Sequence, residues 1–329
     1  MDMMRKAFQA SGLLCMLLLA LGCQADPVPP LFNVLSGKDR IPPVFLGATA
    51  VASDTIICYF NEPVSCDRPN TKIGQQLELL EALSYAQEIK LVVDGIVPPG
   101  VPVSITSRVR DAMGNTLRFS TICWGKNEQV PILLINEFTT KGSGNNPDRV
   151  EVWATTAGNL AGVTFYDGMA DSYESKFTFP SIDVQAKEFL VLYFGQSPPE
   201  GKPNSFHASE VGLGSNNGVL SIYATPGADC LDAVLYSNRT SASDTTFLGF
   251  GTQKVLDRVL LLQKDGSWGI DSTIALKPEM AIDSTYSTAT RSMGRKPDGT
   301  DTDTNLDWQV AATGKASFGA VNSTEVHIP

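Results

Sequence analysis

The sequence predicts an all-β protein built from two β-sandwiches in series, with one or two short helices. Short apolar runs follow one another along the 329-residue chain, and Gly, Pro, Asn or Asp residues separate them. Several of these runs alternate apolar and polar residues, as half-buried strands do. Hydrophobic residues make up 43 % of the chain, which is enough to bury more than one core.

The start of the chain predicts export. The positive pair Arg5-Lys6 precedes an apolar run from Leu13 to Leu21, and this run is too short to span a membrane. The stretch Leu19 to Cys23 then resembles the lipobox of bacterial lipoproteins. The resemblance implies a signal peptide at residues 1–22 and a diacylglycerol and acyl modification on Cys23. A plain secretory signal and an N-terminal anchor helix are the alternatives.

The lipid on Cys23 implies a location in the bacterial cell envelope. Each buried CH₂ group contributes about 0.8 kcal/mol, so several acyl chains hold a protein on a bilayer. Gln24 stands where Asp would retain an enterobacterial lipoprotein in the inner membrane. We therefore expect the outer membrane, on its periplasmic or its surface side. Residues 23–41 are rich in proline and predict an extended tether.

Residues 42–126 predict the first sandwich. Val101 to Val109 alternates apolar and polar residues, a turn follows at Asp111 to Leu117, and Arg118 to Trp124 predicts the next strand. Ile73 to Lys90 has helical apolar spacing and predicts a helix across one end of the sandwich. The stretches ATAVASDTIICYFNEPVSC and DAMGNTL resemble bacterial Ig-like modules. The resemblance implies an Ig-like spacer or interaction module without catalytic residues.

Residues 127–323 predict the second sandwich, and residues 324–329 a C-terminal tail. Six apolar runs predict its strands: Ile132 to Phe138, Asp148 to Trp153, Leu160 to Asp167, Phe189 to Phe194, Gly218 to Tyr223 and Leu231 to Tyr236. The ordered pieces INE, DRVEV, LAGVTFYD and LDAVLY, with SMGRKPDGTDTDTNLDW and GAVN near the end, resemble a lamin-tail domain, which has an Ig fold. Residues 237–290 form an insertion, in which Lys254 to Leu262 predicts a helix or a buried strand.

Charge and histidine content exclude several functions. The formal net charge is −10 and no stretch is rich in Lys or Arg, so we expect no nucleic-acid partner. His207 and His327 are the only histidines, and neither has nearby residues at the spacing of a zinc site or a Ser-His-Asp triad. We expect no catalytic residues, no enzyme activity and no cofactor.

Glu137 and Glu151 fall on neighbouring predicted strands, where two carboxylates could act as acid and base or hold a cation. Acids on such strands are more often solvated or paired with a basic residue. Arg149 lies two residues from Glu151 and on the same face of its strand. We favour the solvated or paired arrangement.

The stretch DGTDTDTNLDW places oxygen-bearing side chains at every second residue. Asp301, Asp303, Asn305 and Asp307 are therefore a candidate calcium set, because calcium takes six to eight oxygen ligands. Leu306 and Ala312 stand where an EF-hand loop needs Gly and Glu. The lamin-tail resemblance implies a structural role instead, which we favour: the acids cap backbone N–H groups in a tight turn, Arg291 or Arg295 neutralises them, and Trp308 enters the core.

Four cysteines remain after the signal peptide and the lipidated cysteine: Cys58, Cys66, Cys123 and Cys230. An exported compartment allows disulfides among them, and four free buried thiols are the alternative.

The sequence thus predicts a non-enzymatic, lipid-anchored envelope protein. We expect it to present a lamin-tail-like domain to a protein, glycan or host partner, as a binding or structural module. One alternative is a calcium-stabilised adhesin or envelope assembly factor. Another is an accessory protein to an exported hydrolase. The membrane, reached through the lipid on Cys23, is the one partner that the sequence identifies, and the oligomeric state is not predicted.

Overall fold

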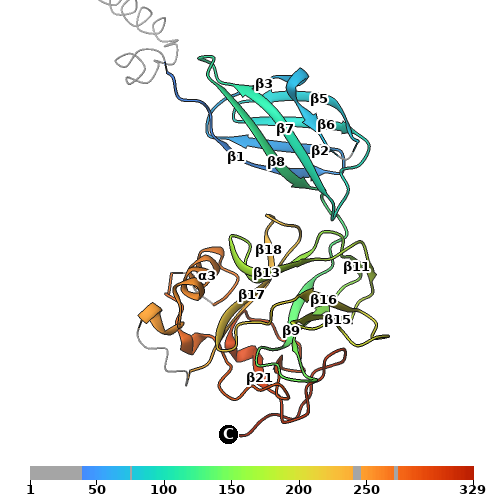
Figure 1. Ribbon diagram of the computed structural model, residues 1–329, viewed down its shortest axis with the longest axis vertical. Helices are drawn as coiled ribbons and strands as arrows, with labels where there is room; N and C mark the ends of the chain where they lie inside the picture. The colour runs from blue at the N-terminus through green and yellow to red at the C-terminus, as the bar shows by residue number, and fades with distance from the viewer. Residues whose placement is uncertain (1–38, 75, 240–245, 270–272) are drawn as a thin grey trace, which may run out of the picture.

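The all-β fold is confirmed by the computed structural model, which describes residues 39–74, 76–239, 246–269 and 273–329. Two β units follow one another along the chain and lie end to end (Figure 1). We call residues 39–126 the N-terminal unit and residues 127–329 the C-terminal unit. Among the residues described, no helix is long and apolar enough to cross a bilayer. The predicted signal peptide, Cys23 and most of the predicted tether lie outside the described residues.

The N-terminal unit contains two four-stranded sheets around one core. The first sheet has the order β1-β2-β6-β5, from β1 (Phe45–Ala52), β2 (Thr55–Phe60), β6 (Glu88–Asp94) and β5 (Glu78–Tyr85). In the second sheet, β3 (Ser65–Cys66), β4 (Lys72–Ile73) and β8 (Thr116–Trp124) all pair with β7 (Pro102–Arg110). Strand β7 buries every second residue, as its sequence predicts. A short 3₁₀ turn, η1 (Arg68–Asn70), lies between β3 and β4.

The helix expected at Ile73 to Lys90 is wrong, because strands β4, β5 and β6 occupy this stretch. The reason is a bulge in β5, where the pairing with β6 shifts between Leu79 and Glu81. The bulge lets Leu79 and Ala82, three residues apart, both pack against the core. Three-residue spacing of apolar side chains is the signature of a helix, so a bulged strand imitates it.

The C-terminal unit is larger and has two main sheets. One has the order β16-β15-β10-β9-β20-β21, with β16 (Ser205–Ser209), β15 (Glu188–Phe194), β10 (Asp148–Ala154), β9 (Leu133–Thr139), β20 (Met293–Arg295) and β21 (Trp308–Val310). The other has the order β13-β12-β17-β18-β19, with β13 (Ser172–Thr178), β12 (Thr164–Met169), β17 (Asn217–Tyr223), β18 (Cys230–Ser237) and β19 (Ile282–Asp283). A small ladder joins β11 (Gly158–Asn159) to β14 (Asp183–Val184). A continuous hydrophobic core, separate from that of the N-terminal unit, includes residues of both main sheets.

The predicted insertion belongs to this core. Its stretch Lys254 to Leu262 is helical, inside α3 (Gln253–Asp265), which packs against β17, β12 and β13 (Figure 1). Thr252 caps the helix by accepting a hydrogen bond from the Val255 N–H at 3.3 Å, and Gly266 ends it in a left-handed conformation. Short 3₁₀ turns η2 (Thr246–Gly249), η3 (Pro278–Met280) and η4 (Asn305–Asp307) complete the fold.

The two units touch directly. The backbones of Gly100 and Gly162 approach so closely that a Cβ on Gly100 would lie 2.7 Å from the Gly162 nitrogen. Both glycines have positive φ, so a side chain at either position would strain the backbone of this contact.

Candidate functional site

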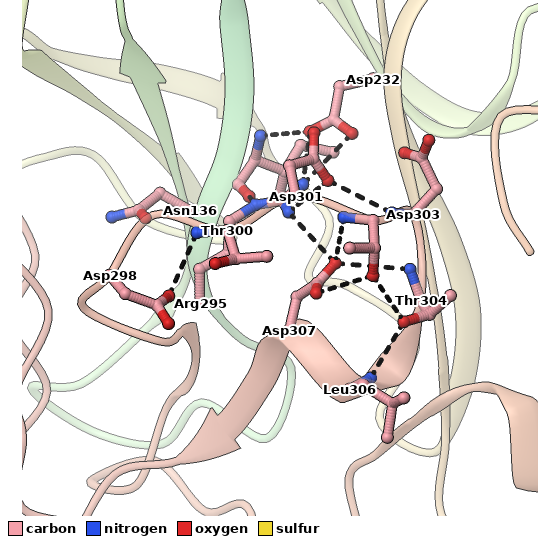
Figure 2. Close-up of polar contacts among 12 residues, drawn as sticks. Asn136, Asp232, Arg295, Asp298, Thr300, Asp301, Asp303, Thr304, Leu306 and Asp307 are labelled. Carbon is pink, nitrogen blue, oxygen red and sulfur yellow. Dashed lines mark hydrogen bonds and ion pairs between the residues drawn. The ribbon is translucent and has the colours of Figure 1, made fainter.

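The stretch DGTDTDTNLDW surrounds a buried arginine (Figure 2). Arg295 ends β20 and is 1 % exposed. Its Nε donates to the Ile135 carbonyl at 2.7 Å, and its Nη1 donates to Asp301 Oδ1 at 2.6 Å. Its Nη2 lies 3.3 Å from both carboxylate oxygens of Asp232 on β18. The guanidinium also lies 5.1 Å from the ring centroid of buried Trp308. Of the two arginines expected to neutralise these acids, Arg295 is the one that contacts them, whereas Arg291 contacts His327.

The acids of the loop cap backbone groups, as expected for the structural role. Asp307 accepts hydrogen bonds from the Thr302 N–H at 2.7 Å and the Thr302 hydroxyl at 2.8 Å. It also forms a capping box with Thr304 at the start of η4. Asp298 accepts from the Thr300 N–H at 3.1 Å, so the first acid of the stretch closes its own turn (Figure 2).

The four candidate calcium ligands do not converge. The Asn305 side chain donates to the Glu279 carbonyl at 3.0 Å, and Asp307 is engaged with Thr302 and Thr304. Asp301 and Asp303 instead lie with Asp232, with one oxygen of each acid within 4.8 Å of the others. Arg295 already contacts Asp232 and Asp301, so a positive charge is present at this cluster. Asp232 was not among the candidates predicted from the sequence, although an acid within the apolar strand LDAVLY indicates a buried charge that needs a partner.

The environment raises the pKa of two acids of this cluster, Asp232 and Asp303. Burial raises the pKa of Asp232 to about 7, against the opposing charge of Arg295. Burial also raises the pKa of Asp303, and the neighbouring Asp301 adds to this effect. The cluster therefore combines one buried arginine with two acids that are costly to ionise, an arrangement typical of a structural ion-pair network.

A second pair of acids lies on the six-stranded sheet that contains β20 and Arg295. Glu137 on β9 and Glu151 on β10 are register partners and are 1 % and 0 % exposed. Glu137 accepts from the Ser317 N–H at 2.9 Å and from the hydroxyls of Ser292 and Ser317. Glu151 accepts from the Gly319 N–H and from the Asn136 side chain. Both acids therefore bind the segment that follows β21.

The expectation that Glu137 and Glu151 are solvated or paired with a basic residue is wrong. The segment Lys315 to Ser323, which we call the closing segment, covers them and excludes water. The Arg149 guanidinium lies 4.1 Å from the Phe318 ring of this segment, and no ion pair joins it to either acid among the described residues. Asn322 secures the far end by donating to the carbonyls of Arg295 at 2.9 Å and Asn136 at 3.1 Å.

Burial governs the proton affinity of this pair as well. It raises the pKa of Glu137, and it raises the pKa of Glu151 to about 8. Hydrogen bonds to Glu151 from Gly319 and Asn136 oppose the shift, and the charge of Glu137 adds to it. One sheet thus presents two buried carboxyl groups that hold a chain segment.

Of the remaining candidate residues, Cys230 lies beside the first cluster, where its thiol donates to the Asp232 carbonyl at 3.5 Å. The described cysteines are all free thiols, and burial raises the pKa of Cys58 and Cys230 to about 12 and that of Cys123 to about 11. Their thiolate fraction is therefore small at neutral pH. His207 contacts exposed Glu210 at 3.0 Å, whereas His327 accepts from the Arg291 guanidinium near the C-terminus.

Comparison with known proteins identifies a family to which the chain is similar. A family model described as "protein second domain", TP_1001_2nd, matches residues 131–206 and 206–310, which is more than half of the chain. The chain belongs to this family. The family match starts at the entry to β9 and ends with β21, so it includes Glu137, Glu151 and Arg295 but not the closing segment. No curated protein matches the chain significantly.

Replacing Arg295 should destabilise the C-terminal unit strongly. Arg295→Met leaves Asp232 buried without its cation, and we expect a loss of about 3–5 kcal/mol in unfolding free energy at pH 8. The double variant Arg295→Met/Asp232→Asn should recover part of this loss. Urea denaturation followed by tryptophan fluorescence measures both values, with exposed Lys202→Met as the control. A loss below about 1 kcal/mol would contradict the structural role of the arginine.

Stability should fall as pH rises from about 5 to about 8.5. A carboxyl group whose pKa rises from 4.5 to about 8 on folding binds its proton more tightly in the folded state, so its contribution is lost above pH 4.5. At about 1.4 kcal/mol per pKa unit, we expect a decrease on the order of 5 kcal/mol from Glu151, and Asp232 should add to it. Glu151→Gln should flatten the pH profile of unfolding free energy, whereas Glu200→Gln, at an exposed site, should not. An unchanged profile in Glu151→Gln would refute the assignment.

Proposed function

We propose that this protein is a non-enzymatic, lipid-anchored envelope protein whose β units serve as binding or structural modules. The observation that carries the proposal is the use of the buried acids. Asp232, Asp307, Glu137 and Glu151 all accept hydrogen bonds from their own chain. Residues that would carry acid-base chemistry in an enzyme hold the scaffold together here.

The lamin-tail resemblance fits this role. The INE piece lies on β9, DRVEV on β10 and LDAVLY on β18, and GAVN lies in the closing segment. Glu137 of the first piece and Glu151 of the second both bind the closing segment. Asp232 of the third binds Arg295. The separated motifs that suggested the resemblance are therefore joined by contacts, which supports treating them as one module.

The lipid anchor is tested by removing its attachment site. Cys23→Ser should release the protein from the membrane pellet into the soluble fraction, because the acyl chains supply the attachment. Cell fractionation with immunoblotting measures this, and Cys15→Ser, which keeps Cys23, is the matched control. Membrane retention of Cys23→Ser would contradict the anchor. Hydrolysis of an ester or phosphodiester by the purified protein would contradict the non-enzymatic part.

A calcium-stabilised adhesin or assembly factor is the second candidate. The cluster of Asp232, Asp301 and Asp303 favours it, because calcium prefers carboxylate oxygens. Arg295 competes with a cation there, so we expect the melting temperature to change by less than about 1 °C between millimolar calcium and EDTA. A calcium-dependent rise of several degrees that is absent in Asp301→Asn/Asp303→Asn would support the second candidate instead.

A further inference from the structure

The folded N-terminal unit separates its charges between its two sheets. The strands β3, β4, β7 and β8 carry no acid, and their outward positions hold four basic side chains: Lys72, Arg108, Arg110 and Arg118. The opposite sheet carries Glu78, Glu81, Glu88 and Asp94, with Lys90 as its basic residue. The charges are scattered in the sequence, and the fold collects them. We call the outward surface of the first group the arginine face.

Most of the basic side chains of the arginine face have no acidic partner in the described fold. Arg108 and Arg118 are register partners on β7 and β8, and like charges directly opposite each other on one face destabilise a sheet. Asp67 offsets part of this by accepting from Arg108 Nε at 2.9 Å, and this ion pair lowers the pKa of Asp67. In the described chain, no ion pair involves Lys72, Arg110 or Arg118. The excess charge in a protein of net charge −10 is a reason to look for an anionic ligand.

The arginine face also contains a concave place for a ligand. A shallow pocket of about 340 Å³ is lined by Ser65, Asp67, Arg108, Arg110 and Thr116, among others. Further hydroxyl groups follow on the outward side of β7 and β8, at Ser104, Thr106 and Ser120. The two strands are nine residues long each, which gives a track of about 30 Å. They lie side by side in Figure 1.

We propose that the arginine face binds an acidic polysaccharide, with sugar carboxylates on the arginines and sugar hydroxyls on the serines and threonines. A guanidinium forms two parallel hydrogen bonds with a carboxylate, which suits a regularly spaced acidic chain. Apolar and aromatic side chains that insert into a bilayer are scarce here, since Ile122 is the exposed large apolar residue of β7 and β8. This surface lies on the N-terminal unit, so the proposal goes beyond the binding role of the lamin-tail-like unit and does not require the lipid anchor.

The test uses full-length protein in non-ionic detergent, with polygalacturonate as the acidic polysaccharide and dextran as the neutral one. We expect polygalacturonate binding in 50 mM salt that weakens as salt rises, and no dextran binding. The double variant Arg110→Gln/Arg118→Gln should weaken binding about tenfold or more, since each substitution removes one guanidinium group. Lys202→Gln/Lys264→Gln removes the same charge from exposed sites on the C-terminal unit and should bind as the unmodified protein does.

Hydrogen exchange gives a readout that needs no variant. Bound polygalacturonate should slow exchange at β7 and β8 and leave β5 and β6 unchanged. The proposal is overturned if polygalacturonate does not bind, if both double variants lose affinity equally, or if protection falls outside β7 and β8. It is also overturned if phosphatidylglycerol vesicles or a DNA duplex bind this face while polygalacturonate does not. Since the protein stays in detergent, the outcome is independent of the Cys23→Ser result.

Discussion

The burial of Arg295 is the constraint on which the C-terminal unit depends. A guanidinium at 1 % exposure is stable only when nearly all its donors are paired, and its partners come from three distant parts of the chain. They are the Ile135 carbonyl on β9, Asp232 on β18, and Asp301 in the loop before β21. Since β9 and β18 belong to different sheets, this one side chain joins the two layers of the sandwich.

Arg295 is a buried cation bound by acids, whereas the closing segment is held by buried acids that accept hydrogen bonds from neutral donors. Glu137 and Glu151 receive backbone N–H groups from Ser317 and Gly319, so a segment with little secondary structure acquires fixed partners. Two neighbouring carboxyl groups with a single nearby cation are costly to ionise, and burial raises both pKa values. The family match ends before this segment, so the acids lie within the shared region while their partners lie outside it.

Local patterns allowed much of the fold to be predicted, and non-local pairing explains what was missed. The alternation in Val101 to Val109 identified β7, because one face is buried along its full length. The bulge at Leu79 made β5 look helical, and no local pattern reports a bulge whose cause lies in the neighbouring strand. The resemblance of the turn to a lamin-tail domain suggested the capping acids and left Arg291 and Arg295 as alternatives for their cation. Asp232, 63 residues away from Arg295, required the two sheets to be packed first.

The two units use their charged residues in different ways. Among the described residues, every buried charged side chain except Asp111 lies in the C-terminal unit, where such groups bind their own chain. The N-terminal unit instead directs Arg110, Arg118 and Lys72 outward without an ion pair among the described residues. Charge that is paired internally contributes stability and is unavailable to a ligand, whereas exposed charge contributes little stability and remains available. The buried charges of the C-terminal unit are therefore committed to its own stability, whereas the outward charges of the arginine face are free to meet the acidic ligand proposed for it.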